Sequence, residues 1–317
     1  MPLVVTGAAG FIGSTLCSAL LADGQRVRAL DRRHPATDPI AAANLAAVVD
    51  HPDFELVTAD LLEVDLADLF DGARAVVHLA GQPGVQTSWG DGFAAHVEGN
   101  VLGSQVAMEA ARRAGVPRFV LASSSSVYGD VARGGAREGA PVSPRSPYGV
   151  SKAAAEQLAG VYAERGLPVV ALRYFTVYGP RQRPDMALHR IVAAAQGGDA
   201  FVRRGDGKQR RELTYVDDVV QATIAAAQAD LPPGWIGNVG GGASTSLNAL
   251  IALVEELGGR PVPIEPSPAL PGDPARTAAD LRRTTSALGW SPRTSLREGV
   301  ARQIEWQASV RALLVSP

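Results

Sequence analysis

The sequence predicts an α/β fold built on a doubly wound parallel sheet. Short apolar runs alternate with alanine-rich stretches of helical spacing, which is typical of a parallel sheet covered by helices on both faces. A glycine-rich turn directly after the first run supports this fold, because phosphate-bearing ligands bind at that position. The expected strands lie at residues 3–6, 27–31, 55–57, 75–79, 119–123 and 169–173.

Apolar spacing also predicts the main helices, and proline predicts where they stop. Residues 258–274 are rich in proline, so we expect an extended segment there. The expected helices span about 14–22, 101–114, 152–165, 187–195 and 284–314.

The regular alternation ends near Tyr174, which suggests two domains. We expect residues 1–174, with about 213–240, to form a Rossmann-type domain that binds a dinucleotide. Residues 175–212 and 241–317 are expected to form a smaller C-terminal α/β domain that binds the substrate.

Composition excludes several classes of function. The 317 residues carry a formal net charge of −2, so no basic field points to nucleic acid. The single cysteine, Cys17, excludes an internal disulfide and a zinc site of several thiolates, and we expect no metal centre. We expect the side chain of Cys17 to be small, apolar and buried. No apolar run reaches the ~18–20 residues of a membrane span, and no leader pattern precedes the first strand, so we expect a soluble cytoplasmic protein without membrane contact.

The glycine-rich turn spans Thr6–Gly13, between the first strand and the first helix. Gly7 permits the tight turn, Gly10 lets the backbone approach a pyrophosphate, and Gly13 lets the helix pack closely on the strand. Phe11 and Ile12 lie within the turn, which leads into a helix whose positive end meets the phosphates. This context predicts a dinucleotide site.

An acid at the end of the second strand favours NAD as the dinucleotide. Asp31 lies about twenty residues beyond the turn, where a carboxylate binds the adenosine ribose and repels a 2′-phosphate. Arg32 and Arg33 follow directly and could accept such a phosphate, so NADP is the weaker alternative.

Residues at other strand ends are expected to complete the cofactor site. Asp60 and Leu61 follow the third strand, where they are placed to contact the adenine. Leu79 and Ala80 end the fourth strand, and Tyr174 directly follows the sixth, so all three are expected to line the cofactor cleft.

Tyr148 and Lys152 form a candidate proton-transfer pair. Their spacing places them on one face of a helix, where the ammonium, with the positive nicotinamide ring, favours the phenolate of Tyr148. Lys152 is one of only two lysines, the other cations being arginines, so a chemical role explains its presence. Ser124 lies at a strand end that leads to the ligand edge of the sheet. Asn100 is expected to be a buried amide that ties its helix to the sheet.

These motifs resemble those of the extended short-chain dehydrogenases, in particular the sugar-nucleotide epimerases and dehydratases. The resemblance covers essentially the whole chain, through the glycine-rich turn, the Tyr-x-x-x-Lys pair and the segments 173–175 and 215–219. It implies that Tyr148, aided by Ser124, takes the proton of the sugar 4-hydroxyl while hydride passes to a tightly bound NAD. The 4-keto sugar then turns, and the hydride returns to its opposite face.

The serine run distinguishes the subgroup. Dehydratases carry Thr-Asp-Glu where this chain has Ser124-Ser125-Ser126, and decarboxylases acting on UDP-glucuronate usually carry Glu at Ser126. Galactose-type epimerases usually carry Asn at Thr176. The chain is most similar to UDP-glucuronate 4-epimerases, which interconvert UDP-glucuronate and UDP-galacturonate.

The resemblance also implies substrate contacts. Small hydroxyls can bind the sugar carboxylate without adding charge, and cations are needed for the pyrophosphate. Leu270 and Gln86 replace arginines found in some relatives, whereas Arg181, Arg203, Arg204 and Arg210 are expected to be solvated surface charges. The expected contacts are Ser125, Ser126 and Thr176 to the carboxylate, Arg183, Arg190 and Arg211 to phosphate or sugar, and Asp273 to the nucleotide ribose.

Other activities stay open at this point. The substrate could be UDP-glucose or a UDP-N-acetylhexosamine, or the chain could be a ketoreductase that consumes reduced cofactor. A nucleotide-sensing scaffold without chemistry is a further alternative, against which Ser124, Tyr148 and Lys152 together argue. The resemblance implies a homodimer formed through the helices that begin near Asn100 and Lys152.

Overall fold

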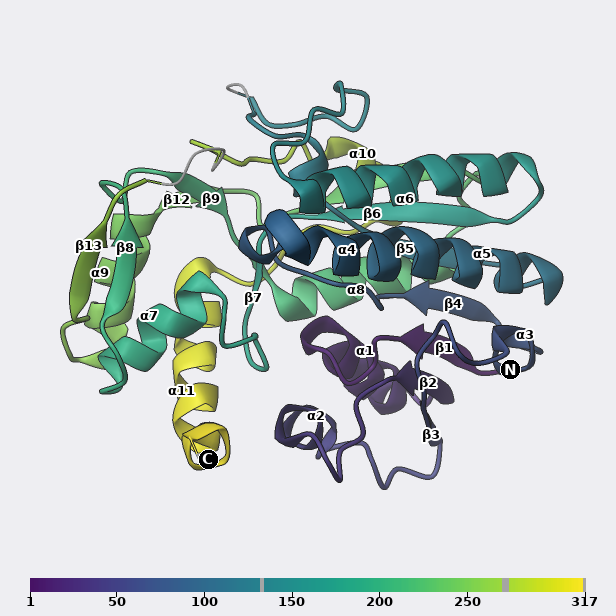
Figure 1. The fold of residues 1–317 in the computed structure, drawn as a ribbon, viewed down its shortest axis with the longest axis horizontal. Coiled ribbons are helices and arrows are strands. Elements are labelled where there is room, and N and C mark those ends of the chain that lie inside the picture. The colour runs from purple at the N-terminus through teal and green to yellow at the C-terminus, as the bar shows by residue number, and fades with distance from the viewer. Residues whose placement is uncertain (132–133, 270–273, 316–317) are drawn as a thin grey trace.

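The central feature of the fold is a parallel sheet of seven strands in the order β11-β6-β5-β4-β1-β2-β3 (Figure 1). The computed structural model describes residues 1–131, 134–269 and 274–315. All neighbouring pairs in this sheet are parallel, which confirms the predicted doubly wound α/β fold. The strands are β1 (Leu3–Thr6), β2 (Val27–Asp31), β3 (Phe54–Thr58), β4 (Ala75–His78), β5 (Phe119–Ser124), β6 (Val169–Tyr174) and β11 (Trp235–Val239).

Helices cover both faces of the sheet, and Figure 1 shows α5 and α6 side by side along one of them. Two separate groups of buried apolar residues result, one on each side of the strands. One face carries α1 (Phe11–Ala22), α2 (Pro39–Leu45) and α8 (Val216–Gln228), and the other carries α3 (Leu66–Phe70), α5 (Gly103–Arg113) and α6 (Pro147–Glu164).

Capping residues fix where α6 begins. Ser146 precedes the helix with extended backbone, and its side chain accepts a hydrogen bond from the Gly149 N–H at 3.1 Å. Pro147 occupies the first turn, where its missing N–H costs nothing. The helix start is therefore fixed at Pro147, one residue before Tyr148.

Shorter elements lead into α5 and α6. Strand β5 is followed by a single 3₁₀ turn, and α5 is preceded by a π-helix, whose wider turn is common at functional sites. These elements are η1 (Gln86–Ser88), η2 (Gly90–Gly92), α4 (Phe93–His96), the π-helix η3 (Val97–Leu102) and η4 (Ser125–Val127).

The later part of the chain builds a smaller region, at the left of Figure 1, beside the carboxyl ends of β5 and β6. Its strands form three two-stranded sheets: β7 with β10, β9 with β12, and β8 with β13. Its elements are β7 (Val177–Tyr178), α7 (Ala187–Ala195), β8 (Phe201–Arg204), β9 (Arg210–Glu212), β10 (Thr214–Tyr215), β12 (Ser244–Ser246), α9 (Leu247–Gly258), β13 (Ile264–Ser267), α10 (Arg282–Leu288) and α11 (Leu296–Val315).

One predicted helix proves to be two. The helix expected over 284–314 divides into α10 and α11, because Gly289 ends α10 with a φ of 61°. Pro292 follows and cannot continue a helix. The helix predicted over 187–195 is confirmed as α7.

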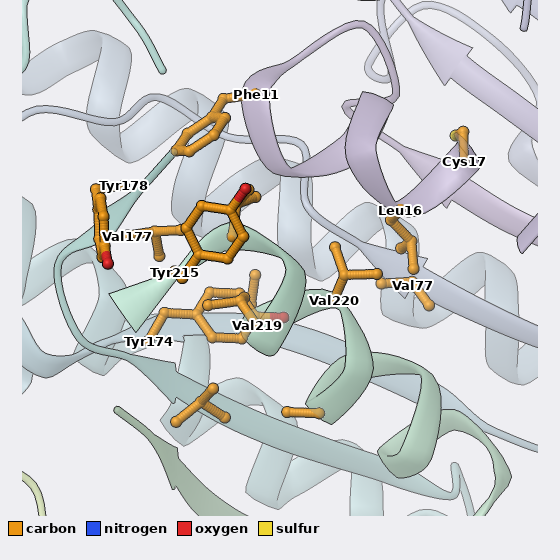
Figure 2. Close-up of a cluster of buried hydrophobic side chains, with 14 of the residues drawn as sticks. Phe11, Leu16, Cys17, Val77, Tyr174, Val177, Tyr178, Tyr215, Val219 and Val220 are labelled. Atoms are coloured by element: carbon orange, nitrogen blue, oxygen red, sulfur yellow. The ribbon is translucent and has the colours of Figure 1, made fainter. Parts of the chain in front are cut away.

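Cys17 lies in the core, as predicted. It is fully buried on α1 within the larger apolar cluster (Figure 2), and burial raises the pKa of its thiol to about 12. Among the described residues, no helix is long and apolar enough to cross a membrane, and no cluster of His, Cys, Asp or Glu has the arrangement of a metal site.

Candidate active site

The glycine-rich turn lies where the strand order reverses, between β1 and its two neighbours. The backbone needs glycine here: Gly7 has a φ of 71°, and a Cβ on it would lie 2.7 Å from the nitrogen of Ala80. A Cβ on Gly13 would lie 2.1 Å from the carbonyl oxygen of Gly7. The turn thus leaves a bare backbone cradle at the switch point of the sheet, which fits a dinucleotide.

The N-terminus of α1 opens toward this cradle. Gly10 precedes the helix and offers no side-chain cap. The first N–H groups of the helix, at Phe11 and Ile12, have no intrahelical acceptors, and they form the positive end of the helix dipole. They are suited to a pyrophosphate.

Asp31 is buried beside the turn, with its side chain 5% exposed. Its Oδ2 accepts a hydrogen bond from the Ala9 N–H at 2.9 Å, and Oδ1 accepts from the Arg33 N–H at 3.0 Å. The guanidinium of Arg33 is also paired with this carboxylate, at 3.3 Å. Asn44 completes the site, because its Nδ2 donates to the Ala9 carbonyl at 3.0 Å. Asn44 carried no signal in the sequence.

The end of β4 is tied to the turn through its backbone. The N–H groups of Leu79 and Ala80 donate to the carbonyl and the hydroxyl of Thr6, each at 3.2 Å. The ring nitrogens of His78 face two hydroxyls, of Thr6 at 2.8 Å and Ser104 at 3.3 Å, so the neutral ring is satisfied. Burial, with the nearby Lys152 charge, lowers the pKa of His78 to about 3. His78 is therefore a structural link rather than a proton carrier.

Asp60 and Leu61 lie just past β3, at the same edge of the sheet. The Asp60 Oδ1 accepts from the Leu62 N–H at 2.9 Å, which shapes the turn. The Leu61 side chain lies against the start of α5, 3.5 Å from where a Cβ on Gly103 would stand. Their contact with adenine stays a prediction.

The structure brings the proton-transfer residues together. Tyr148 lies on α6 and its hydroxyl is hydrogen-bonded to Ser124 at the end of β5. One turn later, Lys152 donates from Nζ to the Ala122 carbonyl at 3.0 Å. Burial lowers the pKa of Lys152 to about 8, against the raising influence of Glu156.

The cation that acts on the phenol of Tyr148 is not Lys152, which the sequence predicted. Burial raises the pKa of Tyr148, while the Ser124 hydrogen bond and the charge of Arg183 lower it. Lys152 turns its ammonium to the backbone of β5 instead. Arg183 therefore supplies the positive charge near the phenol in the protein alone.

Asn100 joins three parts of the site from the π-helix η3. Its Oδ1 accepts from the Gln82 N–H, and its Nδ2 donates to the Gln82 carbonyl and the Ser151 hydroxyl, each at 2.9 Å. Ser151 in turn donates to the carbonyl of Tyr148 at 2.8 Å. The amide is completely buried. It holds the segment after β4 against α6, in keeping with the structural role that the sequence predicts.

His96 is a site residue that the sequence analysis missed. Its ring meets the ring of Tyr148 edge to face, with centroids 5.9 Å apart. Its Nδ1 lies 2.9 Å from the Gly92 carbonyl and its Nε2 lies 3.1 Å from the Gly84 carbonyl. His96 thus holds the segment 84–92 beside Tyr148. No motif marks it, since a lone histidine in a helix is usually structural.

The predicted carboxylate-binding hydroxyls follow two adjacent strands. Ser124 pairs in register with Tyr174, so Ser125 and Ser126 lie just beyond β5 and Thr176 just beyond β6. The N–H of Ser126 donates to Ser124 Oγ at 3.1 Å, which turns the chain at the strand end. These positions share one edge of the sheet, and their contact with a substrate stays a prediction.

The predicted substrate arginines occupy different surroundings. Arg183 lies near Tyr148 and is bound through two nitrogens to Asp185, at 2.9 and 2.8 Å. Arg190 is exposed on α7 with its guanidinium 5.8 Å from the Phe201 ring. Arg211 lies on β9 and donates to the Arg210 carbonyl at 2.9 Å. Asp273, like Leu270, lies outside the described residues.

Two expectations about side chains need correction. Arg181 is not a solvated surface charge: it is partly buried and donates to the Ser18 hydroxyl on α1 at 3.1 Å, because its loop crosses that helix. Tyr174 points its side chain into the core (Figure 2), where its hydroxyl lies 2.8 Å from Thr223 on α8. The buried side chain of Tyr174 therefore does not line the cofactor cleft, and a main-chain contact with the cofactor stays a prediction.

Comparison with known proteins shows the family. The family model described as the NAD dependent epimerase/dehydratase family matches residues 3–240. A Bacillus subtilis protein named as an uncharacterized UDP-glucose epimerase, YtcB, is 38% identical over 313 residues, 98% of this chain and 99% of that protein. The chain therefore belongs to the NAD-dependent epimerase/dehydratase family, which confirms the predicted resemblance.

Two solved structures share almost the whole fold. The UDP-glucuronic acid 4-epimerase of Bacillus cereus, in complex with UDP-glucuronic acid and NAD, has a TM-score of 0.93 and 37% identity, covering 98% of this chain and all of that chain. MoeE5 in complex with UDP-glucuronic acid and NAD has a TM-score of 0.90 and 42% identity, covering 98% and 99%. MoeE5 is also solved with UDP-glucose and NAD.

Proposed function

We propose that this chain is an NAD-dependent 4-epimerase of nucleotide sugars, an isomerase that converts UDP-glucuronate to UDP-galacturonate. The observation that carries the proposal is the group formed by Tyr148, Ser124 and Lys152 at the edge of the sheet that holds the dinucleotide cradle. The NAD complexes of the relatives support the choice of cofactor.

The chain's own residues perform the proton transfer. Tyr148 accepts the proton of the sugar 4-hydroxyl and later returns it, and the Ser124 hydroxyl holds the phenol and the sugar oxygen in line. Lys152, bound to β5, keeps its ammonium one helical turn from the phenol, where it adds to the charge of Arg183 that favours the phenolate, and it is placed to bind the nicotinamide ribose. Bound NAD supplies the hydride acceptor and gives the hydride back.

The cofactor is held by the residues that shape the cradle. The α1 N-terminus binds the pyrophosphate and Asp31 binds the adenosine ribose, with its carboxylate already fixed by Ala9. We propose that Asp60 and Leu61 contact the adenine. Because substrate oxidation and reduction balance, NAD stays bound through each cycle.

The choice of UDP-glucuronate depends on the strand-end hydroxyls. Ser125, Ser126 and Thr176 stand at one edge beside Ser124, and none of them is acidic. Neutral donors can bind the carbon 5 carboxylate without adding charge, and they restrain it against loss of carbon dioxide from the 4-keto sugar. The glucuronate-bound relatives support this substrate.

The smaller region is proposed to bind the nucleotide. Residues 175–212 and 241–317 form the sugar-nucleotide-binding domain in this proposal. Arg183 lies closest to the chemistry, and the pyrophosphate competes with Asp185 for its guanidinium. Arg190, Arg211 and Asp273 are proposed as the remaining contacts.

UDP-glucose is the second candidate substrate. The complex of MoeE5 with UDP-glucose, beside its complex with UDP-glucuronic acid, favours keeping it. Gln86 lies where some relatives that act on glucuronate carry arginine, so a neutral hexose is compatible with this position.

Proton NMR of the purified protein distinguishes these candidates. With UDP-glucuronate and no added cofactor, we expect the anomeric signal of UDP-galacturonate to grow. If the protein converts UDP-glucose but not UDP-glucuronate, the second candidate is the substrate and the first is excluded. Turnover that requires added NADH or NADPH would indicate a ketoreductase.

We also propose that the chain forms a homodimer through the outer surfaces of α4, η3 and α6. These elements expose large apolar side chains toward solvent, an uncommon arrangement unless another surface covers them. The exposed residues are Phe93, Val97, Leu102, Val150 and Val161, each between 37% and 54% exposed.

A further inference from the structure

Three residues of α6, each four positions after the last, contact the final three residues of β5. A spacing of four places side chains on one helix face, so the third residue belongs to the same row as the proton-transfer pair. The contacts are Tyr148 with Ser124, Lys152 with Ala122, and Glu156 with Ser123.

Glu156 is held rigidly in this row. Its side chain is 4% exposed, and its partner Arg173 on β6 is 3% exposed. The guanidinium binds both carboxylate oxygens, at 2.9 Å from Nε and 2.6 Å from Nη2. Arg173 is itself fixed, because it lies 4.6 Å from the centre of the Tyr128 ring and donates to the Glu138 carbonyl.

Stability alone is a weak explanation for this buried pair. The cost of removing two charges from water offsets much of their attraction, and apolar replacements of such pairs are often neutral or stabilising. The position of the pair, one helical turn from a buried ammonium, gives it a second consequence.

The charges around Lys152 make Glu156 the anion that acts on it. From α6, the phenol of Tyr148 faces Ser124, and from β4, His78 is uncharged. From β6, the guanidinium of Arg173 is bound to both oxygens of the Glu156 carboxylate. Burial alone disfavours the ammonium of Lys152, and the charge of Glu156 opposes that effect.

We propose that Glu156 is a positioning residue for proton transfer, whose fixed carboxylate keeps Lys152 an ammonium and holds Ser123, and so Ser124, at the end of β5. This inference rests on the roles proposed for Tyr148 and Lys152. The effect of Glu156 on the charge of Lys152 does not require a bound nucleotide sugar.

The sign of the expected effect follows from the charges. Loss of the carboxylate removes the influence that raises the pKa of Lys152, so the pKa falls from about 8. The ammonium is then lost at lower pH, and the falling alkaline limb of the kcat profile moves toward neutral pH. A purely structural carboxylate would leave that limb in place.

The chain makes this measurement direct, because it has only two lysines. Lysine labelled with ¹³C at Cε gives two NMR signals, and Lys208, with a side chain 83% exposed, is an internal reference. The variant is Glu156→Gln with Arg173→Met, which removes both charges and leaves no buried cation without a partner. We expect the pKa of Lys152 to fall by about one unit or more, because Glu156 acts on its charge and Arg173 is not among the groups that do.

A matched control removes a charge from the same helix. The control is Glu164→Gln, because Glu164 is exposed at the end of α6. It lies about 18 Å along the helix from Lys152, which is too far for a charge screened by solvent to act on the ammonium. We expect this variant to keep the Lys152 titration and the kcat profile of the natural protein.

Two results decide the proposal. A lower Lys152 pKa in the double variant, with the alkaline limb shifted alike, supports it, and an unchanged Lys152 titration overturns it. If the double variant does not fold, Glu156→Asp and Ser123→Ala are used instead, because both keep the carboxylate charge. The alkaline limb of the kcat profile must then stay in place in both, and a displaced limb in both overturns the proposal. Because the titration uses no substrate, it is independent of whether UDP-glucuronate is turned over.

Discussion

At the residue scale, the site is a short row of hydroxyl, phenol and ammonium groups whose charges are set by burial. Burial raises the pKa of Tyr148 and lowers the pKa of Lys152, and both changes disfavour the charged form. Ser124 and Arg183 oppose the change at Tyr148, and Glu156 opposes the change at Lys152. To accept the sugar proton Tyr148 must be a phenolate, which burial disfavours and which the charge of Arg183 and the positive nicotinamide ring of bound NAD favour.

Removal of the phenol hydroxyl tests this row. Tyr148→Phe keeps the ring against His96 and removes only the group that moves the proton. We expect kcat to fall about 10²–10⁴-fold while NAD is retained, because general acid–base catalysis contributes that much. Steady-state rates and the absorbance of released NAD measure the two effects. Unchanged turnover would exclude Tyr148 as the proton carrier.

The cofactor acid can be tested in the same way. Asp31→Ala removes a carboxylate that accepts a hydrogen bond from the Ala9 N–H and that is proposed to accept hydrogen bonds from the adenosine ribose. Hydrogen bonds to a charged group contribute about 1.5–3 kcal/mol, so NAD should bind roughly 10–150-fold more weakly. Isothermal titration of protein stripped of NAD gives the affinity. An affinity equal to that of the natural protein would contradict the assignment.

At the element scale, the site depends on contacts that join β5, α6, η3 and the segment after β4. The sequence predicts α6 and β5 well, since apolar periodicity and the Tyr-x-x-x-Lys spacing are local signals. It does not predict that η3 is a π-helix, or that His96 faces Tyr148, because both depend on packing between distant segments.

Asn100 tests whether η3 supports the site. Asn100→Ala leaves the half-buried Gln82 backbone without its partner, and the buried Ser151 hydroxyl keeps only its bond to the Tyr148 carbonyl. We expect a loss of about 2–3 kcal/mol in the free energy of unfolding, from buried polar groups left unpaired, together with a lower kcat. Denaturant unfolding and steady-state kinetics measure both quantities. Full stability would show that water replaces the amide without cost.

At the scale of the whole molecule, the order of the strands and the presence of β11 were not predicted. The doubly wound parallel sheet and the glycine-rich turn could be predicted, because the other six strands and each glycine carry their own signal. The direction of individual side chains could not. Arg181 and Tyr174 were assigned to the wrong surroundings, since a loop crosses α1 and a strand residue faces α8 rather than the cleft. Asp273 stays a prediction, outside the described residues.

The proposed dimer is tested on the outer face of α6. Val161→Glu places a charge among apolar residues that the partner copy is proposed to cover, and Val161 is 54% exposed in the single chain, so folding should be unaffected. Light scattering should give a dimer for the natural protein and a monomer for the variant. A natural monomer at micromolar concentration would exclude the proposal.

The most direct test of the central proposal follows the hydride itself. UDP-glucuronate that carries deuterium at carbon 4 is incubated with the purified protein in ordinary water, without added cofactor. If Tyr148 moves the proton and bound NAD returns the same hydride, the UDP-galacturonate formed keeps its deuterium at carbon 4. Product that carries solvent hydrogen at carbon 4, or no product at all even with NAD supplied, would contradict the proposed epimerase.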